Sequence, residues 1–463
     1  MTMRSSRTPT ARRRRRRLAL AAIAMAGAAA VLAGCASAND TPTASSSSGS
    51  GSSAGFTEAK QVANSEITVW TDSTRLPDVQ KYAKENPGVK MNIVTFDGSA
   101  DGSTYLQTKV QLFDRTGKGW PDVVFASPTD VTWASVPTSP SAQPYAAPVD
   151  KLVPSSLLSG FATGSLAPCQ AGGHTYCLRN DIAQVVLWYN KTLMDKWGYQ
   201  VPTTWEQYQA LGEKVAKQHP GYVIGAVGDT NSQESYFWSS QCPAQQLVGP
   251  DTLKVDLSSP DCTRMANLLD PLIADKAIST QGFFTQGFDG SKVLMAVGPS
   301  WYGQYLFNSA FKTPAKQIAA AAPLTWDGQP TTYTGDVGGG VWMISSHSTN
   351  LKAATAVAEW LTTSTENLQG APTYPAYSAG AKAWLANPVN KDYFANDVSP
   401  VFTAAANEVW TGWSNTKFSD ATPWSNTVLP ALTAGKSLAA TLPAWQTAIV
   451  NEAKSVGYSV VTK

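Results

Sequence analysis

The chain has 463 residues, of which 15% are charged, and its formal net charge is +2. This length exceeds what one hydrophobic core usually organises, so we expect two lobes or domains. Part of the positive charge comes from a run of arginines at residues 12–17, and no basic stripe follows it. A nucleic-acid partner is therefore not expected.

Residues 1–35 are predicted to be an export signal, because the arginines precede an apolar run at 18–32 that is short for a membrane span. The residues Leu-Ala-Gly stand directly before Cys35, an arrangement that resembles a bacterial lipobox. The resemblance implies that the Cys35 thiol is acylated and becomes the membrane anchor. A secretory signal with an incidental cysteine is the alternative, and both the general and the twin-arginine export routes stay open.

Residues 36–64 are predicted to be a flexible tether, because Ser, Gly, Ala and Thr dominate most of this stretch and little in it can be buried. A tether behind an acylated cysteine holds a domain away from a membrane.

The beginning of the mature domain alternates between strand and helix patterns. We predict strands at 66–70, 89–96 and 121–125 and helices at 76–85 and 104–117. This alternation is typical of a parallel sheet covered by helices, in which ligands bind at the carboxyl ends of the strands.

The remaining cysteines are even in number, which in an exported chain indicates two disulfides. Proximity in sequence favours Cys169 with Cys177 and Cys242 with Cys262, although three connectivities are possible. A zinc site is the competing interpretation, but neither pair has CxxC spacing and only His174 lies nearby. No metal and no cofactor are expected.

The second half of the chain continues the α/β pattern. We predict an apolar strand at 183–189, a helix at 192–197, a helix with a capping box from Thr203 to Glu206, strands at 221–227 and 292–297, a glycine-containing strand at 334–344 and an amphipathic helix at 351–368. No repeat of about 20 to 50 residues is visible, which argues against a solenoid or propeller.

Several short motifs occur in the order found in the extracellular solute-binding proteins of ABC importers: EITVW at 66–70, PDVVF at 121–125, LWYNK at 187–191, PTTWEQ at 202–207, KVLMAVGPSW at 292–301 and GGGVWMI at 338–344. The chain resembles the carbohydrate-binding branch, which includes maltose-binding protein. The resemblance implies an α/β fold of two lobes with a ligand cleft between them. It also implies an extracellular, lipid-anchored monomer that delivers a carbohydrate to ABC permease subunits.

By the same resemblance the chain crosses between the lobes near Asn180, Leu324 and Ala371. The first lobe is then predicted at 65–180 plus 325–370, and the second at 181–324 plus 371–463.

Sugar sites combine flat aromatic faces with short polar side chains, so the candidate ligand residues are aromatic or polar residues at strand ends and crossings. They are Trp70, Asp72, Asp130, Asp181, Asp229, Trp238, Trp301, Gly339, Tyr374 and Trp410. Trp301 best matches the cleft tryptophan of the family. Core packing is the alternative role for each tryptophan, helix capping for Asp130, and a turn or bulge for the glycines around Gly339.

An enzyme is the competing class, because glycosidases also line clefts with tryptophan and carboxylates. The sequence has neither a GxSxG nor an HExxH motif, and His174, His219 and His347 are its only histidines. We therefore expect a binding protein for a carbohydrate, with another small polar solute or, less favoured, glycoside hydrolysis as alternatives.

Overall fold

The computed structural model describes residues 56–96, 105–137 and 143–463. Cys35, the predicted signal and residues 36–55 of the predicted tether lie outside these ranges. No helix within them is both long and apolar enough to cross a membrane.

The first lobe is built on a mixed sheet with strand order β2-β1-β3-β14-β6. Its strands span β1 Ile67–Thr71, β2 Met91–Thr95, β3 Val123–Ala126, β6 Leu178–Arg179 and β14 Val341–Ile344. Strand β1 is parallel to β2 and β3, as the alternation of strand and helix predicts. Strand β14 is antiparallel to β3 and β6, because the chain returns from the second lobe and enters the sheet in the opposite direction. The three strands of the predicted strand–helix alternation are therefore parallel as expected, and β14 adds an antiparallel strand whose direction the alternation did not predict.

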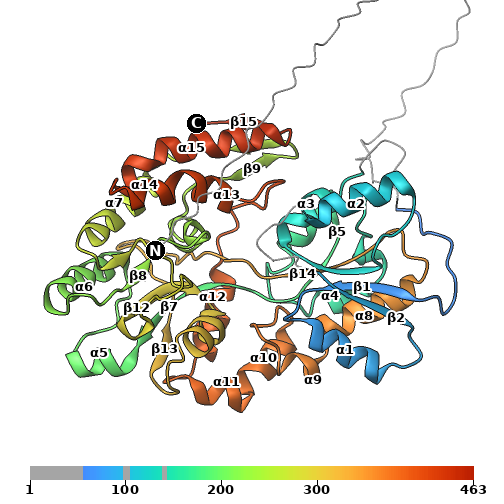
Figure 1. Ribbon diagram of the computed structural model, residues 1–463, viewed down its shortest axis with the longest axis horizontal. Coiled ribbons are helices and arrows are strands. Elements are labelled where there is room, and N and C mark those ends of the chain that lie inside the picture. Colours follow the sequence, from blue (N-terminus) through green and yellow to red (C-terminus); the bar gives the residue numbers. More distant parts are fainter. Residues whose placement is uncertain (1–55, 97–104, 138–142) are drawn as a thin grey trace, which may run out of the picture. The chain divides into compact units, whose positions relative to one another are not determined.

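The sheet is accompanied by helices in the first lobe, some of which contact its strands directly (Figure 1). They span α1 Leu76–Glu85, α2 Tyr105–Thr116, α3 Val131–Ala134, α4 Ser155–Leu158, α8 Leu351–Thr363 and α9 Thr365–Leu368. Helix α8 contacts β3, β6 and β14 through a buried stripe that includes Ala354, Val357 and Leu361. The single helix predicted at 351–368 is divided at Ser364, whose hydroxyl accepts the Asn367 N–H and begins α9.

The second lobe is centred on a sheet with order β12-β7-β13, and β7 is antiparallel to both neighbours. Its elements are β7 Val185–Asn190, β8 Gly225–Ala226, β11 Ile278–Ser279, β12 Met295–Pro299, β13 Ile318–Ala321, α5 Lys191–Trp197, α6 Trp205–Gln218 and α7 Pro260–Ala274, with π-helical turns η4 Glu234–Trp238 and η6 Gly303–Ala310. The capping box predicted from Thr203 is displaced by one residue. The Thr204 hydroxyl accepts the Gln207 N–H, and the Gln207 side chain in turn accepts the Thr203 N–H.

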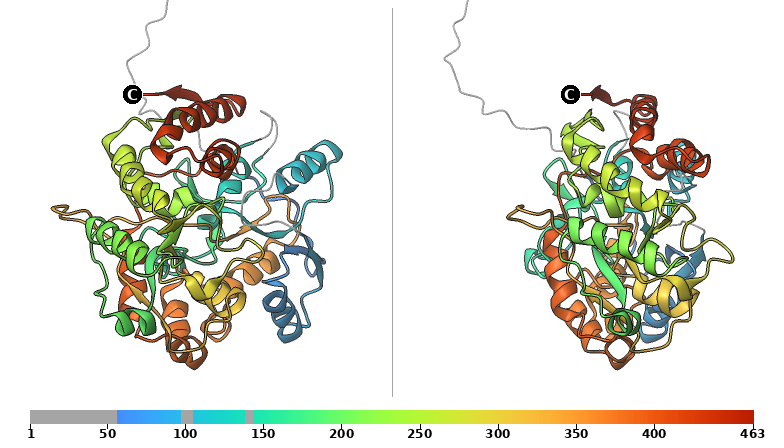
Figure 2. Two further views of the ribbon diagram at one scale, coloured as in Figure 1. Left: turned by 60° about the vertical axis from the view of Figure 1, so that its left-hand side comes forward. Right: turned by 90° about the vertical axis from the view of Figure 1, so that its left-hand side faces the viewer.

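The C-terminal part is mainly helical (Figure 2), and its first helix, α10, packs against α9 of the first lobe. It contains α10 Ser378–Ala386, α11 Pro388–Tyr393, α12 Ser399–Glu408, α13 Ala421–Pro423, α14 Leu429–Thr433, α15 Leu438–Ser455 and β15 Ser459–Val461. Strand β15 pairs with β10 Thr252–Lys254, which pairs with β9 Gln246–Gly249. Helix α15 contacts α7 and the π-helical turn η7 Trp424–Val428, and it buries Trp445 in the core.

Three segments that connect the two sheets lie side by side and exchange backbone hydrogen bonds. The N–H of Ile182 donates to Tyr374 O (3.0 Å), and the N–H of Val337 donates to Ala183 O (3.0 Å). We call residues 180–184, 335–340 and 374–376 the crossing segments. Their mutual bonding makes them one narrow connection between the lobes.

Two predicted boundaries differ from the structure. The segment 325–334, assigned to the first lobe, is bonded to the second, because Thr325 N–H donates to Thr203 O and Asp327 N–H donates to Glu206. Residues 57–64, assigned to the flexible tether, lie against the first lobe. There the Gln61 side chain accepts the Leu351 N–H at 2.9 Å, and such directed bonds are not expected of a free linker.

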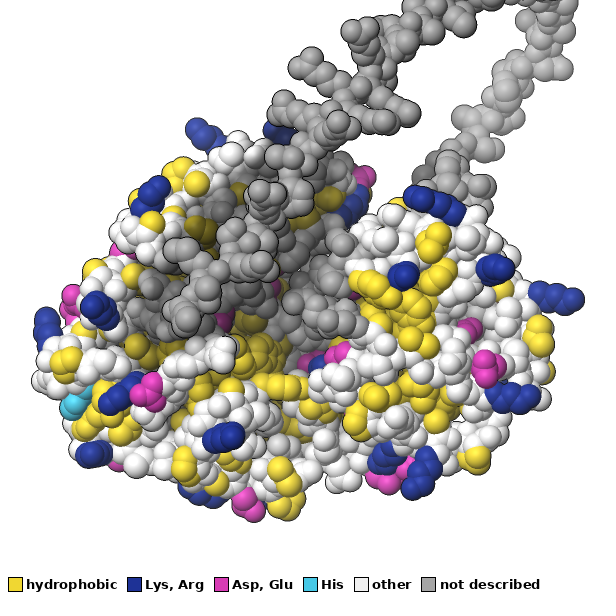
Figure 3. All heavy atoms as spheres, in the orientation of Figure 1, with side chains coloured by type: hydrophobic (Ala, Val, Ile, Leu, Met, Phe, Trp, Pro, Cys, Tyr) yellow, Lys and Arg dark blue, Asp and Glu magenta, His cyan; other side chains and the backbone are white. Residues whose placement is uncertain are grey.

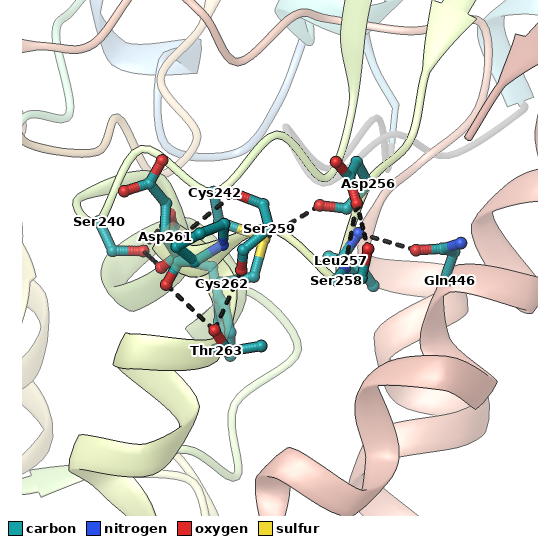
Figure 4. The surroundings of a disulfide bond; sticks show 12 residues. Ser240, Cys242, Asp256, Leu257, Ser258, Ser259, Asp261, Cys262, Thr263 and Gln446 are labelled. Carbon is teal, nitrogen blue, oxygen red and sulfur yellow. Dashed lines mark hydrogen bonds between the residues drawn. A yellow bond between two sulfur atoms is a disulfide. The ribbon is translucent and has the colours of Figure 1, made fainter. Parts of the chain in front are cut away.

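Both disulfides have the local pairing that the sequence favours, Cys169 with Cys177 and Cys242 with Cys262. The second joins the loop after η4 to the first turn of α7, where Figure 4 shows Ser240 and Asp261 beside it. It therefore fixes the end of η4, the turn that carries Trp238, to a long buried helix.

Candidate functional site

A polar cavity of about 50 Å³ lies where residues of both lobes meet the crossing segments. The first lobe contributes the loop after β3, and the second lobe contributes η4 and the loop before α13. The lining residues are Ser127, Pro128, Thr129, Arg179, Asn231, Glu234, Trp238, Gln245, Asp336, Gly338, Trp413, Asn415, Ser419 and Asp420. We call this space the central cavity. Its volume accommodates a few water molecules, so a larger solute enters only if the lobes separate.

Two tryptophans form the aromatic part of the central cavity. The rings of Trp238 and Trp413 are stacked with centroids 5.5 Å apart and an interplanar angle of 9°. The indole N–H of Trp238 donates to the carbonyl of Trp410 at 2.6 Å, which fixes the ring orientation. Trp238 and Trp410 are both predicted site residues. Trp238 lines the cavity, and Trp410 positions it through its backbone.

Acidic groups outnumber basic ones in the lining. Asp336 is paired with Arg179 at 3.0 Å between carboxylate and guanidinium, and it also accepts the Ala183 N–H at 2.8 Å. Arg179 donates further to the carbonyls of Gly338 and Asp181. Arg179 directly precedes the crossing segment 180–184 and donates to Asp181 within it, so the ion pair ties that segment to Asp336 in 335–340. Glu234 and Asp420 are the remaining charges of the central cavity.

Glu234 and Asp420 form a carboxyl pair. Burial raises the pKa of Glu234 well above its usual value, and the neighbouring charges of Asp420 and Asp336 raise it further. Burial also raises the pKa of Asp420, although the neighbouring Gln233 and Glu234 side chains oppose the shift. Two carboxyls in contact cannot both ionise easily, so burial and their proximity both disfavour the doubly ionised pair.

An adjoining cavity of about 360 Å³ opens on the second lobe. It is lined by Gly228, Asp229, Thr230, Asn231, Phe284, Thr285, Trp301, Tyr302 and Val337, and it shares Asn231 with the central cavity. The predicted residues Asp229 and Trp301 both lie here. The Trp301 indole donates to Val337 O at 2.9 Å, and the Asp229 carboxylate accepts the Phe283 N–H at 3.1 Å. Burial raises the pKa of Asp229.

Two other predicted acids bind one arginine next to the crossing segments. Arg75 contacts Asp72 at 3.0 Å and Asp181 at 3.7 Å, and its guanidinium lies 4.5 Å from the centre of the Phe125 ring. Asp181 also accepts the Gly340 N–H at 2.8 Å. The structure thus brings Asp72 and Asp181 together, with Arg75 between them, but neither lines the central cavity.

The other predicted residues have structural contacts. Trp70 packs against Phe96, with ring centroids 5.4 Å apart, in the core of the first lobe. Both carboxylate oxygens of Asp130 are engaged in helix capping and in the bond from the Trp133 indole at 2.8 Å. Gly339 has φ +79°, and a Cβ there would lie 2.5 Å from Arg179, so this glycine makes room for a side chain of the protein.

Tyr374 lies in a separate pocket of about 600 Å³ between α10 and α12. Its ring is buried against Trp384 and Phe402. The structure therefore does not bring Tyr374 together with Trp238 or Trp301.

The sequence analysis missed most of the polar lining, namely Arg179, Glu234, Gln245, Asp336 and Asp420, and also Trp413. Glu234 and Trp238 share the short turn η4, so a search around the predicted Trp238 could have found this acid. Asp336 precedes the glycines of the predicted 334–344 strand and offered a similar signal. Asp420 and Gln245 stand in loops without a distinctive pattern.

No group of three or more His, Cys, Asp or Glu side chains in the described ranges is placed to hold a metal ion. On the face drawn in Figure 3, acidic and basic side chains are interspersed among neutral ones.

Comparison with known proteins identifies the family. Residues 68–368 match the sequence profile of the family described as "Bacterial extracellular solute-binding protein". The chain belongs to this family. It is therefore an extracellular solute-binding protein of an ABC transporter. Members of this family bind solutes and are not enzymes. No curated protein gives a significant match to its sequence.

Solved structures similar to this solute-binding protein have the same fold. A binding protein associated with an ABC transporter of B. animalis subsp. lactis Bl-04, in complex with beta-1,6-galactobiose, has a TM-score of 0.69 and 19% identity over 86% of this chain and 99% of that one. The galacto-N-biose-/lacto-N-biose I-binding protein of Bifidobacterium longum, in complex with lacto-N-biose, has a TM-score of 0.69 and 21% identity over 88% and 100%.

A third similar structure is the GacH receptor of Streptomyces glaucescens GLA.O, solved unliganded and with acarbose. It has a TM-score of 0.63 and 19% identity over 85% of this chain and 99% of the receptor. At such low identities these likenesses establish the α/β fold of the two lobes, as predicted, and not the ligand.

Proposed function

We propose that this solute-binding protein captures a carbohydrate between its lobes, with the central cavity as the core of the site. The observation that carries the proposal is the stacked pair Trp238 and Trp413, which lies beside hydrogen-bonding side chains such as Asn231 and Asn415. Apolar C–H faces of a sugar ring pack on an indole, and its hydroxyls need directional partners at the ring edge. The carbohydrates named for the similar structures support the same ligand class.

The adjoining cavity extends the proposed site. Trp301 and Asp229 line it, and it shares the lining residue Asn231 with the central cavity. An oligosaccharide placed across both cavities would contact Trp238 with one sugar unit and Trp301 with another. We retain Trp238, Trp301 and Asp229 as proposed ligand contacts and add Trp413.

Ligand binding in the central cavity would also favour closure of the lobes. A ligand that contacts the loop after β3 and the turn η4 at once interacts fully only with the closed form, so it shifts the population toward that form. We propose that the closed, loaded protein delivers the sugar to the permease subunits of its transporter.

A saccharide panel tests the ligand class. The unfolding temperature of the purified protein should rise with at least one class of saccharide, because a ligand of the native state stabilises it by mass action. Trp238→Ala and Trp413→Ala should each weaken binding of that saccharide by about 2 kcal/mol, the loss typical of an aromatic anchor.

Trp197→Ala is the matched control. Trp197, the last residue of α5, stacks on His219, which follows α6, and it lines neither cavity. Its removal should therefore leave the affinity for the saccharide unchanged. A rise in unfolding temperature with amino acids or polyamines, and with no saccharide, would show that the ligand class is wrong.

A further inference from the structure

The charges around the central cavity do not balance. Arg179 is its only basic lining residue among those described, and its guanidinium is already bound to Asp336 and to two carbonyl oxygens. Glu234 and Asp420 remain as two carboxyls without a basic partner in the lining.

The surroundings of the Glu234–Asp420 pair supply no compensating cation. The charged groups that act on Glu234 are Asp420 and Asp336, and both are acidic. Lys417, which precedes Asp420 in the same loop, is paired with Asp251 at 2.7 Å. The pair therefore lacks a compensating cation in the lining, and the same burial raises the pKa of each carboxyl.

The lining also contains a buried amide oxygen that accepts no hydrogen bond. Gln245 is 4% exposed, and its Nε2 donates to Ser414 O at 3.0 Å. Its Oε1 is buried and has no hydrogen-bond partner among the described residues. Burying an acceptor without a donor is costly, so this oxygen indicates a ligand group that donates.

The aromatic pair is compatible with a cationic ligand group. Indole faces attract cations as well as sugar C–H groups, and Trp238 and Trp413 line the same cavity as the carboxyls. A sugar hydroxyl can satisfy one acceptor, but only a charged donor offsets the unpaired carboxylate charge.

From these contacts we propose that the central cavity selects a saccharide with a free amine, whose ammonium group binds between Glu234 and Asp420. The inference rests on the proposed carbohydrate function and specifies its substrate class. A bound ammonium supplies the compensating charge that the lining lacks. No bond in the sugar changes.

Three disaccharides of one ring geometry test the proposal by calorimetry: β-1,4-linked glucosamine disaccharide, its N-acetylated form and cellobiose. The amine form should bind about tenfold or more tightly than either neutral form at neutral pH, a difference of about 1.4 kcal/mol.

Carboxyl-to-amide variants test whether Glu234 and Asp420 cause the preference for the amine form. Glu234→Gln and Asp420→Asn should each remove most of the preference for the amine form, while binding of neutral saccharides changes less. Glu366→Gln is the control, because Glu366 is 79% exposed in α9 and lies outside the lining, and it should retain the preference.

The outcomes separate the two proposals. Equal or tighter binding of the neutral disaccharides, or no binding of the amine form, overturns the amine selectivity and leaves the carbohydrate function intact if any saccharide binds. If no saccharide of a wide panel binds, both fail. The ligand comparison on the unaltered protein decides the matter even if a variant does not fold.

Discussion

At the scale of single residues, Asp130 shows how hydrogen bonding and burial have opposite effects on the pKa of a carboxyl. Its carboxylate accepts the Ser127 N–H and the Trp133 indole N–H, and both bonds favour the charged form. Burial outweighs them and raises the pKa of Asp130 to about 6. The sequence left ligand contact and helix capping open for this residue, and the structure shows the cap.

This pKa makes stability depend on pH. An unfolded aspartate has a pKa of ~3.9, so the folded protein binds the proton more tightly, and Asp130 costs stability as pH rises through about 6. The difference in free energy of unfolding between wild type and Asp130→Asn should change by about 2 to 3 kcal/mol between pH 4 and 7, with the variant favoured at the higher pH. Denaturant titrations across this range measure it.

Asp392→Asn is the control for this experiment, because Asp392 is 75% exposed in α11. Its difference from wild type should stay nearly constant with pH. A constant difference for Asp130→Asn as well would show that Asp130 is not protonated preferentially in the folded state.

At the scale of elements, the turn before β14 depends on glycine for space. Gly339 has φ +79°, and its missing Cβ leaves room for the guanidinium of Arg179, which binds Asp336. A side chain here strains the backbone and also displaces a buried ion pair.

Gly339→Ala should therefore lower the free energy of unfolding by about 2 kcal/mol or more beyond the loss caused by Gly328→Ala. Gly328 has a similar φ of +76° but open space around its Cβ position, so the comparison removes the cost of the backbone conformation. Equal losses in chemical denaturation would mean that the contact with Arg179 contributes nothing.

Elements were predicted well where one local pattern decides them. Helix α1 at Leu76–Glu85 and the stripe of α8 follow from the spacing of their apolar residues. The break at Ser364 and the displaced cap at Thr204 depend on which hydroxyl reaches a free N–H, and periodicity does not contain that information. The antiparallel entry of β14 depends on the path of the whole chain.

At the scale of the whole molecule, the family resemblance predicted the two-lobed α/β fold that the structure and the family match confirm. The lining of the two candidate cavities was predicted only partly. Trp238, Trp301 and Asp229 line these cavities, but Glu234, Asp336 and Asp420 come together from three distant segments. Their proximity is a result of the fold, and single-sequence spacing cannot reveal it.

The lipid anchor at Cys35 also belongs to this scale and remains a proposal, since the residue lies outside the described ranges. The unaltered protein should fractionate with membranes and resist extraction by salt, because acyl chains contribute about 0.8 kcal/mol per buried CH₂ group. Cys35→Ser should appear in the soluble fraction with unchanged thermal unfolding. Membrane association that survives this substitution would rule out acylation as the anchor.

The contacts of residues 61 and 62 determine how such an anchor acts on the protein. Gln61 is bonded to Ser348 and Leu351, and the Val62 N–H donates to Thr349 O at 2.8 Å. Tension applied through the N-terminus thus enters the first lobe at the start of α8 and does not pass through the crossing segments. An anchor attached through this end of the chain would therefore pull on the first lobe and leave the crossing segments free of that load.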